Sequence, residues 1–259
     1  MFKNLSPGEK RRLCQLDDVA TLYRKEVFDD LRFVQIPFAE DLEIGTRILQ
    51  NGYKIAFLHS VGVIHSHNRS ASYFLKRYYI DYITLPRILS YEVPYVFESH
   101  SSARDVFSYV VWLYAVLNAC IESLKSVSFD ESGEKMILKV RTLIEDISKS
   151  DPSELRKFER SDESLDLVFD EIEKVVGRTD LKANRAVIQQ YFDRLDDYKP
   201  YMRIYNSLWE KKTEFIDLLY KLFSITAAMA FGNYYLFRSS NREVNQESSV
   251  LNHILSGGV

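Results

Sequence analysis

The chain has 259 residues, 46% of them hydrophobic, and a formal net charge of −3. A chain of this size and composition can bury a sizeable core and suits one large or two modest domains. Its charge is close to neutral and its Lys and Arg residues form no long basic run, which argues against a nucleic-acid partner.

We expect no export signal, because the N-terminal segment has no recognisable signal peptide. Residues 1–8 are followed by a charged run instead of an apolar one, unlike a signal peptide. Cys14 and Cys120 are the two cysteines, and their spacing supports neither a metal site nor a redox motif, although it leaves a disulfide open. We therefore expect a soluble cytoplasmic protein with reduced thiols.

An acidic pair, Glu40-Asp41, precedes a helical pattern. Apolar residues recur at roughly helical spacing over residues 42–49, and Asn51-Gly52 is a stop signal, so the pair is expected in the first turn of a short helix. The helix dipole favours ionised carboxylates there, and an ionised carboxylate beside an acceptor hydroxyl can take its proton. Asp41 is the candidate base. The alternative is that one of the two acids only caps the helix.

Two short apolar segments, residues 54–58 and 61–64, follow and have the character of strands. They place His65 and His67 at a strand end. Side chains separated by one residue in an extended segment point the same way, which suits joint contact with a metal ion or a phosphate. No third ligand is in view, so a solvent-facing or core-hydrogen-bonded histidine pair is the open alternative.

Together these elements resemble the family 2 glycosyltransferases with a GT-A fold, in particular rhamnosyltransferases. The resemblance covers about residues 18 to 90. It is specific because the motifs occur together in the order and spacing of that family. The segments that carry it are residues 20–28, the acidic box 38–47 that includes Arg47, residues 52–55 and the histidine element 65–68.

The resemblance implies an inverting transferase. Asp41 corresponds to the base that deprotonates the acceptor hydroxyl while a nucleotide diphosphate is displaced from the sugar, and Glu40 would support it or bind the acceptor. His65, with His67 as the alternative, would lie near the donor diphosphate and its divalent cation, Mg²⁺ or Mn²⁺. Arg47 would pair with a carboxylate or simply cover the helix face.

The donor side of such an enzyme is not recognisable. Only about forty residues precede the acidic pair, no two aspartates are separated by a single residue, and no Gly-rich loop follows a strand. We expect the donor site to be missing or supplied elsewhere. The chain would then be a truncated or split gene product, a C-terminal piece of a longer enzyme, or a remnant repurposed as a binding module. In the first two cases a separate N-terminal half is an expected partner.

From residue 70 onward helical periodicity prevails. An aromatic-rich helix is expected over residues 70–84, with Pro86 kinking or ending it. Lys76 and Arg77 on this helix are candidates for contact with a phosphate or an anionic acceptor, and a plain solvated face is their alternative role.

Further helices are expected over most of the remaining chain. The first contains an uncharged run, residues 106–121, that is shorter than a bilayer crossing, so we expect a buried core helix and keep interfacial membrane contact as the alternative. Asp151-Pro152 is a clear helix start. The expected helices cover residues 103–125, 136–147, 151–177, 181–197 and 201–237.

The expected fold class is α+β, mainly α. A small α/β remnant of a GT-A domain would occupy residues 1–100, a helical domain residues 101–238 and a flexible tail residues 239–259. The expected function is transfer of a sugar from a nucleotide-sugar donor, such as dTDP-rhamnose or a UDP-sugar, to a cell-surface glycan or lipid-linked acceptor. A non-catalytic helical interaction module is the alternative. Peripheral contact at the inner face of the membrane is left open.

Overall fold

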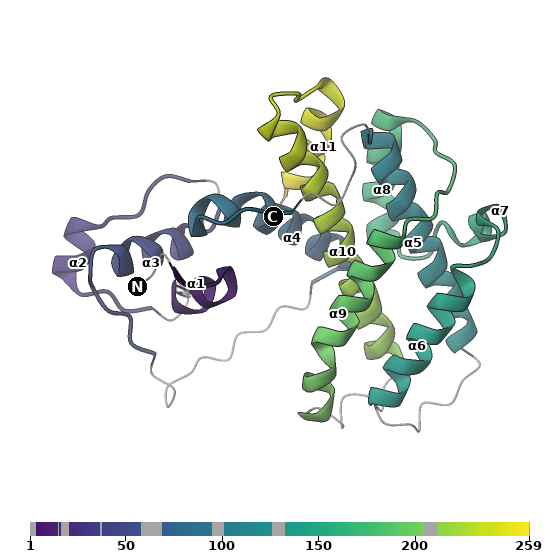
Figure 1. Cartoon of the computed structure of the whole chain (residues 1–259), viewed down its shortest axis with the longest axis horizontal. Helices are drawn as coiled ribbons and strands as arrows, with labels where there is room; N and C mark the ends of the chain where they lie inside the picture. The colour runs from purple at the N-terminus through teal and green to yellow at the C-terminus, as the bar shows by residue number, and fades with distance from the viewer. Residues whose placement is uncertain are drawn as a thin grey trace. The chain divides into compact units, whose positions relative to one another are not determined.

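The computed structural model describes residues 4–14, 16, 21–36, 38–57, 69–94, 101–125, 133–204 and 212–258. Within these ranges the chain is mostly helical and contains no β-strand (Figure 1). The mainly α part of the expected fold class is confirmed. The strand expected at 54–58 is not formed at residues 54–57, which are irregular, because a strand needs a hydrogen-bonded neighbour and the described ranges provide none. Residues 61–64 lie outside the described residues.

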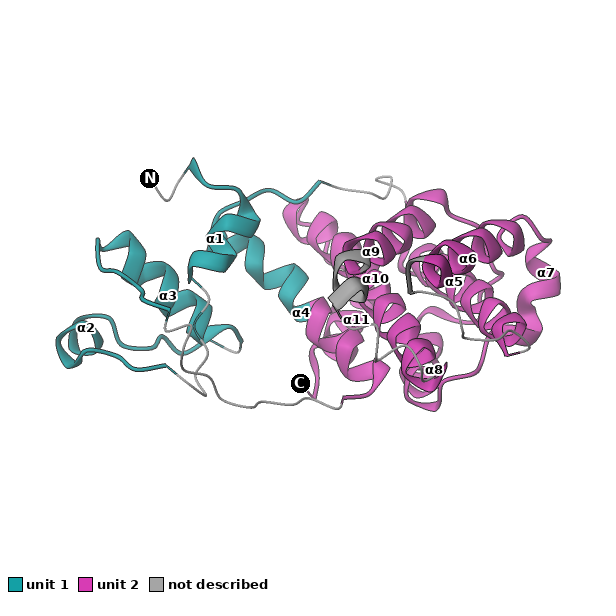
Figure 2. Cartoon of the chain, turned by 90° about the horizontal axis from the view of Figure 1, so that it is seen from below, with its two compact units in different colours: residues 1–68, 80–94 teal, residues 69–79, 95–259 magenta. Residues whose placement is uncertain are grey.

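The chain divides into two compact units, coloured separately in Figure 2. Unit 1 comprises Met1–Asn68 and Ile80–Pro94, and unit 2 comprises Arg69–Tyr79 and Tyr95–Val259. Helix α4 (Ala71–Leu89) is continuous and contributes its first turns to unit 2 and its last turns to unit 1.

Unit 1 contains short helices and the end of α4. Its helices are α1 (Pro7–Cys14), α2 (Lys25–Asp30) and α3 (Glu40–Gln50). Two small apolar clusters hold it together. One contains Cys14, Ala39, Leu42, Leu85 and Leu89, and the other contains Leu16, Ile44 and Ile48 with Tyr23, Val27, Phe28, Leu31 and Ile55 against them.

Helices α1 and α3 approach each other closely at Gly45. A Cβ atom added to this glycine would lie well under 3.0 Å from the Cys14 carbonyl oxygen, a distance that real Cβ atoms essentially never show. The neighbouring atom belongs to the backbone and cannot move aside as a flexible side chain can. Gly45 is therefore required by the packing of α1 on α3.

The C-terminal end of α4 is held by Lys10 of α1. The Lys10 side chain is buried, and its Nζ donates to the carbonyl oxygens of Leu89 and Ser90 at 3.0 and 3.4 Å. A cation is favoured at this end of a helix. The helix continues through Pro86 to Leu89, so Pro86 does not end it. It stops instead at Ser90, whose φ of 53° is left-handed.

Unit 2 is a bundle built around α5 (Ala103–Leu124), which packs against α6, α8, α9 and α10. Helix α5 begins where the sequence predicts. The other helices of unit 2 are α6 (Gly133–Ile147), α7 (Pro152–Leu155), the short 3₁₀ helix η2 (Arg156–Phe158), α8 (Glu163–Val176), α9 (Arg185–Ile204), α10 (Lys212–Ser240) and α11 (Gln246–Ser256).

Three expectations for unit 2 differ from the structure. The helices expected over residues 181–197 and 201–237 have other bounds, because α9 continues to Ile204 without the expected break after residue 197, and α10 begins at Lys212. The helix predicted from Asp151 to Gly177 is divided, because Asp162 accepts the Leu165 N–H and starts α8 as a separate helix. The tail expected to be flexible contains α11, which begins at a reciprocal cap between Asn245 and Ser248. Leu251 and Leu255 of α11 are buried, so this segment contributes to the core of unit 2.

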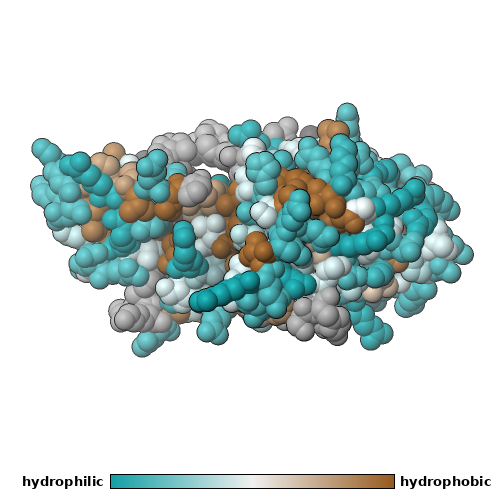
Figure 3. All heavy atoms as spheres, turned by 90° about the horizontal axis from the view of Figure 1, so that it is seen from above, coloured by the Kyte–Doolittle hydropathy of each residue, from teal (hydrophilic) through white to brown (hydrophobic). Residues whose placement is uncertain are grey.

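Helices α5 and α10 are both long and apolar enough to cross a bilayer by length and composition. In the structure, 83% of the apolar window of α5 and 72% of that of α10 are buried inside the protein, and the two helices pack on each other. This burial agrees with the expected role of α5 as a core helix. On the face drawn in Figure 3, hydrophobic residues gather in several patches among hydrophilic ones.

Buried polar groups connect α5 to its neighbours. The Tyr114 hydroxyl donates to the Asp166 carboxylate at 3.1 Å and accepts the Asp162 N–H at 2.7 Å. The Tyr220 hydroxyl contacts the Asn118 side-chain oxygen at 3.0 Å. A buried polar group is costly unless it is paired, so these hydrogen bonds select one arrangement of the helices.

The first turn of α5 is stabilised electrostatically. Ser102 and Asp105 cap it reciprocally, and Lys182 Nζ lies 2.6 Å from the Asp105 carboxylate. The hydrogen bond from Lys182, followed by those from Ser102, lowers the pKa of Asp105 from 3.8 to about 2. A carboxylate with a lowered folded-state pKa adds stability above its unfolded pKa and loses that contribution as the pH falls.

Substitution of Asp105 by Asn is expected to lower the free energy of unfolding of unit 2 by roughly 1 kcal/mol at neutral pH, discounted because Lys182 is half exposed. The difference from the wild type should shrink as the pH falls from 3.8 toward about 2. Urea unfolding followed by tryptophan fluorescence measures it. Asp146→Asn, which breaks an exposed pair with Lys149, serves as the control and should change little at any pH. Equal effects of the two substitutions would refute the prediction.

Substitution of Gly45 by Ala is expected to destabilise unit 1 by roughly 1–3 kcal/mol, because the new methyl group collides with the Cys14 carbonyl. Hydrogen exchange of the amides of α1 and α3 measures the effect. The matched control is Gly8→Ala, since a Cβ at Gly8 meets nothing within 4 Å. The control should leave exchange unchanged or slow it slightly. Similar exchange rates in both variants would contradict the close contact.

Candidate functional site

Helix α3 carries the acidic pair in its first turn, as the sequence predicts. The residue that precedes the helix is Ala39, which has a left-handed φ of 61° and makes no side-chain cap. Asp41 Oδ1 accepts the Leu42 N–H at 2.7 Å and so satisfies one of the free amides of the first turn. Asp41 thus has a capping contact and remains partly accessible, while Glu40 is exposed.

The two acids lie on different sides of α3. At about 100° of rotation per residue, Glu40 is about 20° from Arg47 around the helix axis, whereas Asp41 is about 120° from it. Asp41 shares its side of the helix with Gly45, about 40° away. Since Gly45 contacts Cys14, Asp41 occupies the side of α3 that faces α1. The two carboxylates therefore have different neighbours.

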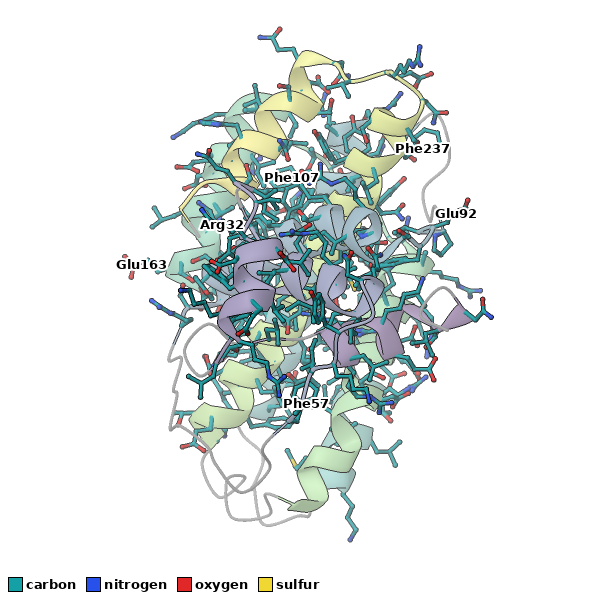
Figure 4. The ribbon with its side chains drawn as sticks, turned by 90° about the vertical axis from the view of Figure 1, so that its left-hand side faces the viewer. Arg32, Phe57, Glu92, Phe107, Glu163 and Phe237 are labelled. Carbon is teal, nitrogen blue, oxygen red and sulfur yellow. The ribbon has the colours of Figure 1, made fainter. Side chains whose placement is uncertain are left out.

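Arg47 is held in a fixed position. Its Nε donates to both carboxylate oxygens of Glu43 at 2.8 and 3.0 Å, and its Nη2 donates to the Arg32 carbonyl oxygen at 2.6 Å. Arg32 is labelled in Figure 4. Of the two roles considered for Arg47, the pairing with a carboxylate is the one observed. The pair is internal to α3 and leaves part of the guanidinium accessible.

A hollow of about 350 Å³ lies beside this pair. It is formed by one side of α3, the extended segment before it and the end of α4. The residues that line it are Val34, Ile36, Glu43, Thr46, Arg47, Gln50, Arg87, Ile88 and Ser90. Asp41 does not line it. The hollow combines apolar walls with two guanidinium groups and one carboxylate, which suits a small polar ligand.

Sequence reasoning singled out Arg47 but missed the rest of this hollow. Arg87 follows Arg47 by forty positions and carries no motif of its own. A cation in the last turn of a helix is common, because the helix dipole favours it there. Only the packing of α3 beside α4 makes Arg87 a neighbour of the hollow.

Lys76 and Arg77 belong to unit 2, whereas Glu40, Asp41 and Arg47 belong to unit 1. Lys76 Nζ donates to the Gly257 carbonyl oxygen at 2.9 Å, so it holds the end of α11. Arg77 is half-buried. The anion-binding role suggested for this pair stays a prediction.

His65 and His67 lie outside the described residues. Among the residues that the structure describes, no group of three or more His, Cys, Asp and Glu side chains is placed to hold a metal ion. Cys14 and Cys120 are buried free thiols, and burial raises the pKa of Cys120 to about 12. A thiol with so high a pKa stays protonated and is a poor nucleophile or metal ligand.

No protein-family model matches the chain, and the comparisons with curated proteins and with solved structures found no match either.

Proposed function

We propose that this chain is the acceptor-side part of an inverting glycosyltransferase, which transfers a sugar from a nucleotide-activated donor to a cell-surface glycan. The observation that carries the proposal is the position of Glu40-Asp41 in the first turn of α3, within the ordered set of motifs that resembles the family 2 transferases. The donor by that resemblance is dTDP-rhamnose or a UDP-sugar, and the acceptor is a glycan or a lipid-linked glycan.

Asp41 is the general base of the proposed reaction. The acceptor hydroxyl oxygen forms a bond to the anomeric carbon as the bond to the nucleotide diphosphate breaks, and the hydroxyl proton passes to the Asp41 carboxylate. The N-terminal end of α3 favours the ionised carboxylate that this step requires. Glu40 is exposed beside it and binds or orients the acceptor.

The divalent cation of the proposed enzyme has no ligand set in the described residues. The resemblance suggests His65 or His67 for contact with Mg²⁺ or Mn²⁺, and both lie outside the described residues. The proposed steps therefore rest on the carboxylates alone. The donor diphosphate would be bound mainly by a separate nucleotide-binding half.

Unit 1 exposes several large apolar side chains. Among the described residues, most of the exposed large hydrophobic side chains belong to unit 1, although unit 2 is the larger unit. Those in unit 1 are Leu13, Leu22, Phe33, Val34, Tyr53 and Phe57, and those in unit 2 are Leu138, Leu167 and Val244. Exposed apolar side chains on a small unit are what the proposed separate half would cover if they form a continuous surface.

A non-catalytic interaction module is the second candidate. It is favoured by the capping contact of Asp41 with Leu42 and by the use of Lys76 to hold α11, since both give these residues structural roles. In either case we place the chain in the cytoplasm. Contact of α5 or α10 with the inner face of the membrane is the less favoured arrangement, given their burial.

The role of Asp41 as the general base is tested by measuring sugar transfer. The assay uses this chain combined with a nucleotide-binding half that restores transfer activity. Substitution of Asp41 by Asn should lower the rate of transfer by roughly 10²- to 10⁴-fold with folding preserved, because the proton of the acceptor then has no base. Glu40→Gln should lower it less. Asp146→Asn on the surface of unit 2 is the control. Transfer at the wild-type rate by the folded Asp41→Asn protein would exclude Asp41 as the base and favour the interaction module.

The isolated chain is expected to bind nucleotide sugar only weakly, because the residues described here offer no recognisable donor site. A calorimetric titration with a dTDP-sugar or a UDP-sugar, with and without Mg²⁺, measures this. Tight binding that depends on the metal would show that the donor site lies within the chain, and the proposal of a separate donor half would then be wrong.

A further inference from the structure

The hollow beside α3 presents hydrogen-bond donors that the protein itself does not use. Arg47 has five N–H groups, of which its Nε–H is committed to Glu43 and one on Nη2 to the Arg32 carbonyl oxygen. Its remaining N–H groups have no acceptor among the described residues. Because both committed groups are fixed, the guanidinium is pre-oriented, so little side-chain entropy is lost when a ligand binds.

Arg87 adds a second guanidinium on another wall. Its side chain is exposed, and none of its N–H groups has an acceptor in the described part of the chain. Gln50 and Ser90 contribute an amide and a hydroxyl to the same lining. Two cations against the single carboxylate of Glu43 leave the hollow with a net positive charge, and Glu43 is already occupied by Arg47.

A helix C-terminus carries partial negative charge and would normally repel an anion. At the end of α4 this repulsion is reduced. Ser90 lines the hollow, and the carbonyl oxygens of Leu89 and Ser90 accept from the buried Lys10 ammonium. Lys10 therefore offsets the negative end of the helix dipole. This arrangement makes the local potential more favourable for a negatively charged ligand.

We infer that the hollow between α3 and the end of α4 binds an oxyanion, a phosphate or a carboxylate, of a small polar ligand. Arg47 and Arg87 would contact the anion from two walls, as the guanidinium geometry favours. The Val34, Ile36 and Ile88 side chains would contact the less polar part of the ligand. This inference goes beyond the proposed transferase activity, because binding at the hollow can be measured without any transfer of sugar.

The alternative role of Arg87 is structural. A cation in the last turn of α4 interacts with the helix dipole, and an exposed arginine needs no ligand. The two roles differ in one measurable respect, since only the binding role predicts a saturable effect of an added oxyanion on the residues that line the hollow.

The test is a nuclear magnetic resonance titration of the full chain with inorganic phosphate and, separately, with glucuronate, at constant ionic strength. At least one probe should shift the signals of Gln50, Ser90 and the Arg47 Nε–H in a saturable way. Stronger binding of phosphate would identify a phosphate ligand, and stronger binding of glucuronate would identify a sugar carboxylate.

Substitution of Arg87 by Gln is expected to weaken the binding of that probe by about fivefold, as for the loss of one exposed charged contact. Arg87 is exposed, so the variant should fold. The matched control is Lys54→Gln, which removes one exposed positive charge of unit 1 that does not line the hollow, and it should bind as the wild type does.

Two results would overturn the inference. One is the absence of saturable shifts with both probes, and the other is an equal loss of affinity in the Arg87→Gln and Lys54→Gln variants, which would indicate only a general effect of charge. Neither result bears on Asp41, whose role is tested by sugar transfer. A failure of the Asp41 test would likewise leave oxyanion binding at the hollow intact.

Discussion

Unit 1 depends on the close approach of α1 to α3 at Gly45. Because this position has no Cβ, the backbone of Cys14 can lie against α3, and α1 is brought into place to present Lys10 to the end of α4. The absence of a methyl group at Gly45 thus permits two contacts between segments that are distant in sequence: Cys14 with α3, and Lys10 with the end of α4. The position of α3 among its neighbours, and with it the surroundings of both acidic residues, follows from this contact.

The same packing gives the two sides of α3 different chemical character. The side of Asp41 and Gly45 faces α1, and its apolar neighbours belong to the core of unit 1. The side of Arg47 faces the hollow, which has both apolar and charged walls. Glu40 and Asp41 are adjacent in sequence but point to different sides of α3, because consecutive helical residues point in directions about 100° apart. Any acceptor that contacts both Glu40 and Asp41 must approach the N-terminal end of the helix.

The two most apolar helices of unit 2, α5 and α10, form its buried core. Helices α5 and α10 are as apolar as membrane spans, yet most of the apolar window of each is buried inside the protein. Some polar residues within them are paired, as Asn118 is with Tyr220 and with the Phe158 carbonyl oxygen, whereas the buried Trp112 Nε1 makes no hydrogen bond in the described part of the chain. An apolar core surrounds these hydrogen bonds and strengthens them, so the bundle has both a large hydrophobic contribution and a defined arrangement of its helices.

The sequence by itself determined the local features. The acidic pair in the first turn of α3, the start at Asp151-Pro152 and the core helix α5 were all predictable, because capping, helical periodicity and turn residues act within a few positions. The tertiary structure decided which side of α3 each acid occupies, how α4 ends beyond Pro86 and that Arg47 and Arg87 line one hollow. It also decided that α11 folds against the core. These outcomes depend on contacts between residues that are distant in sequence, and the local sequence around each residue does not specify such contacts.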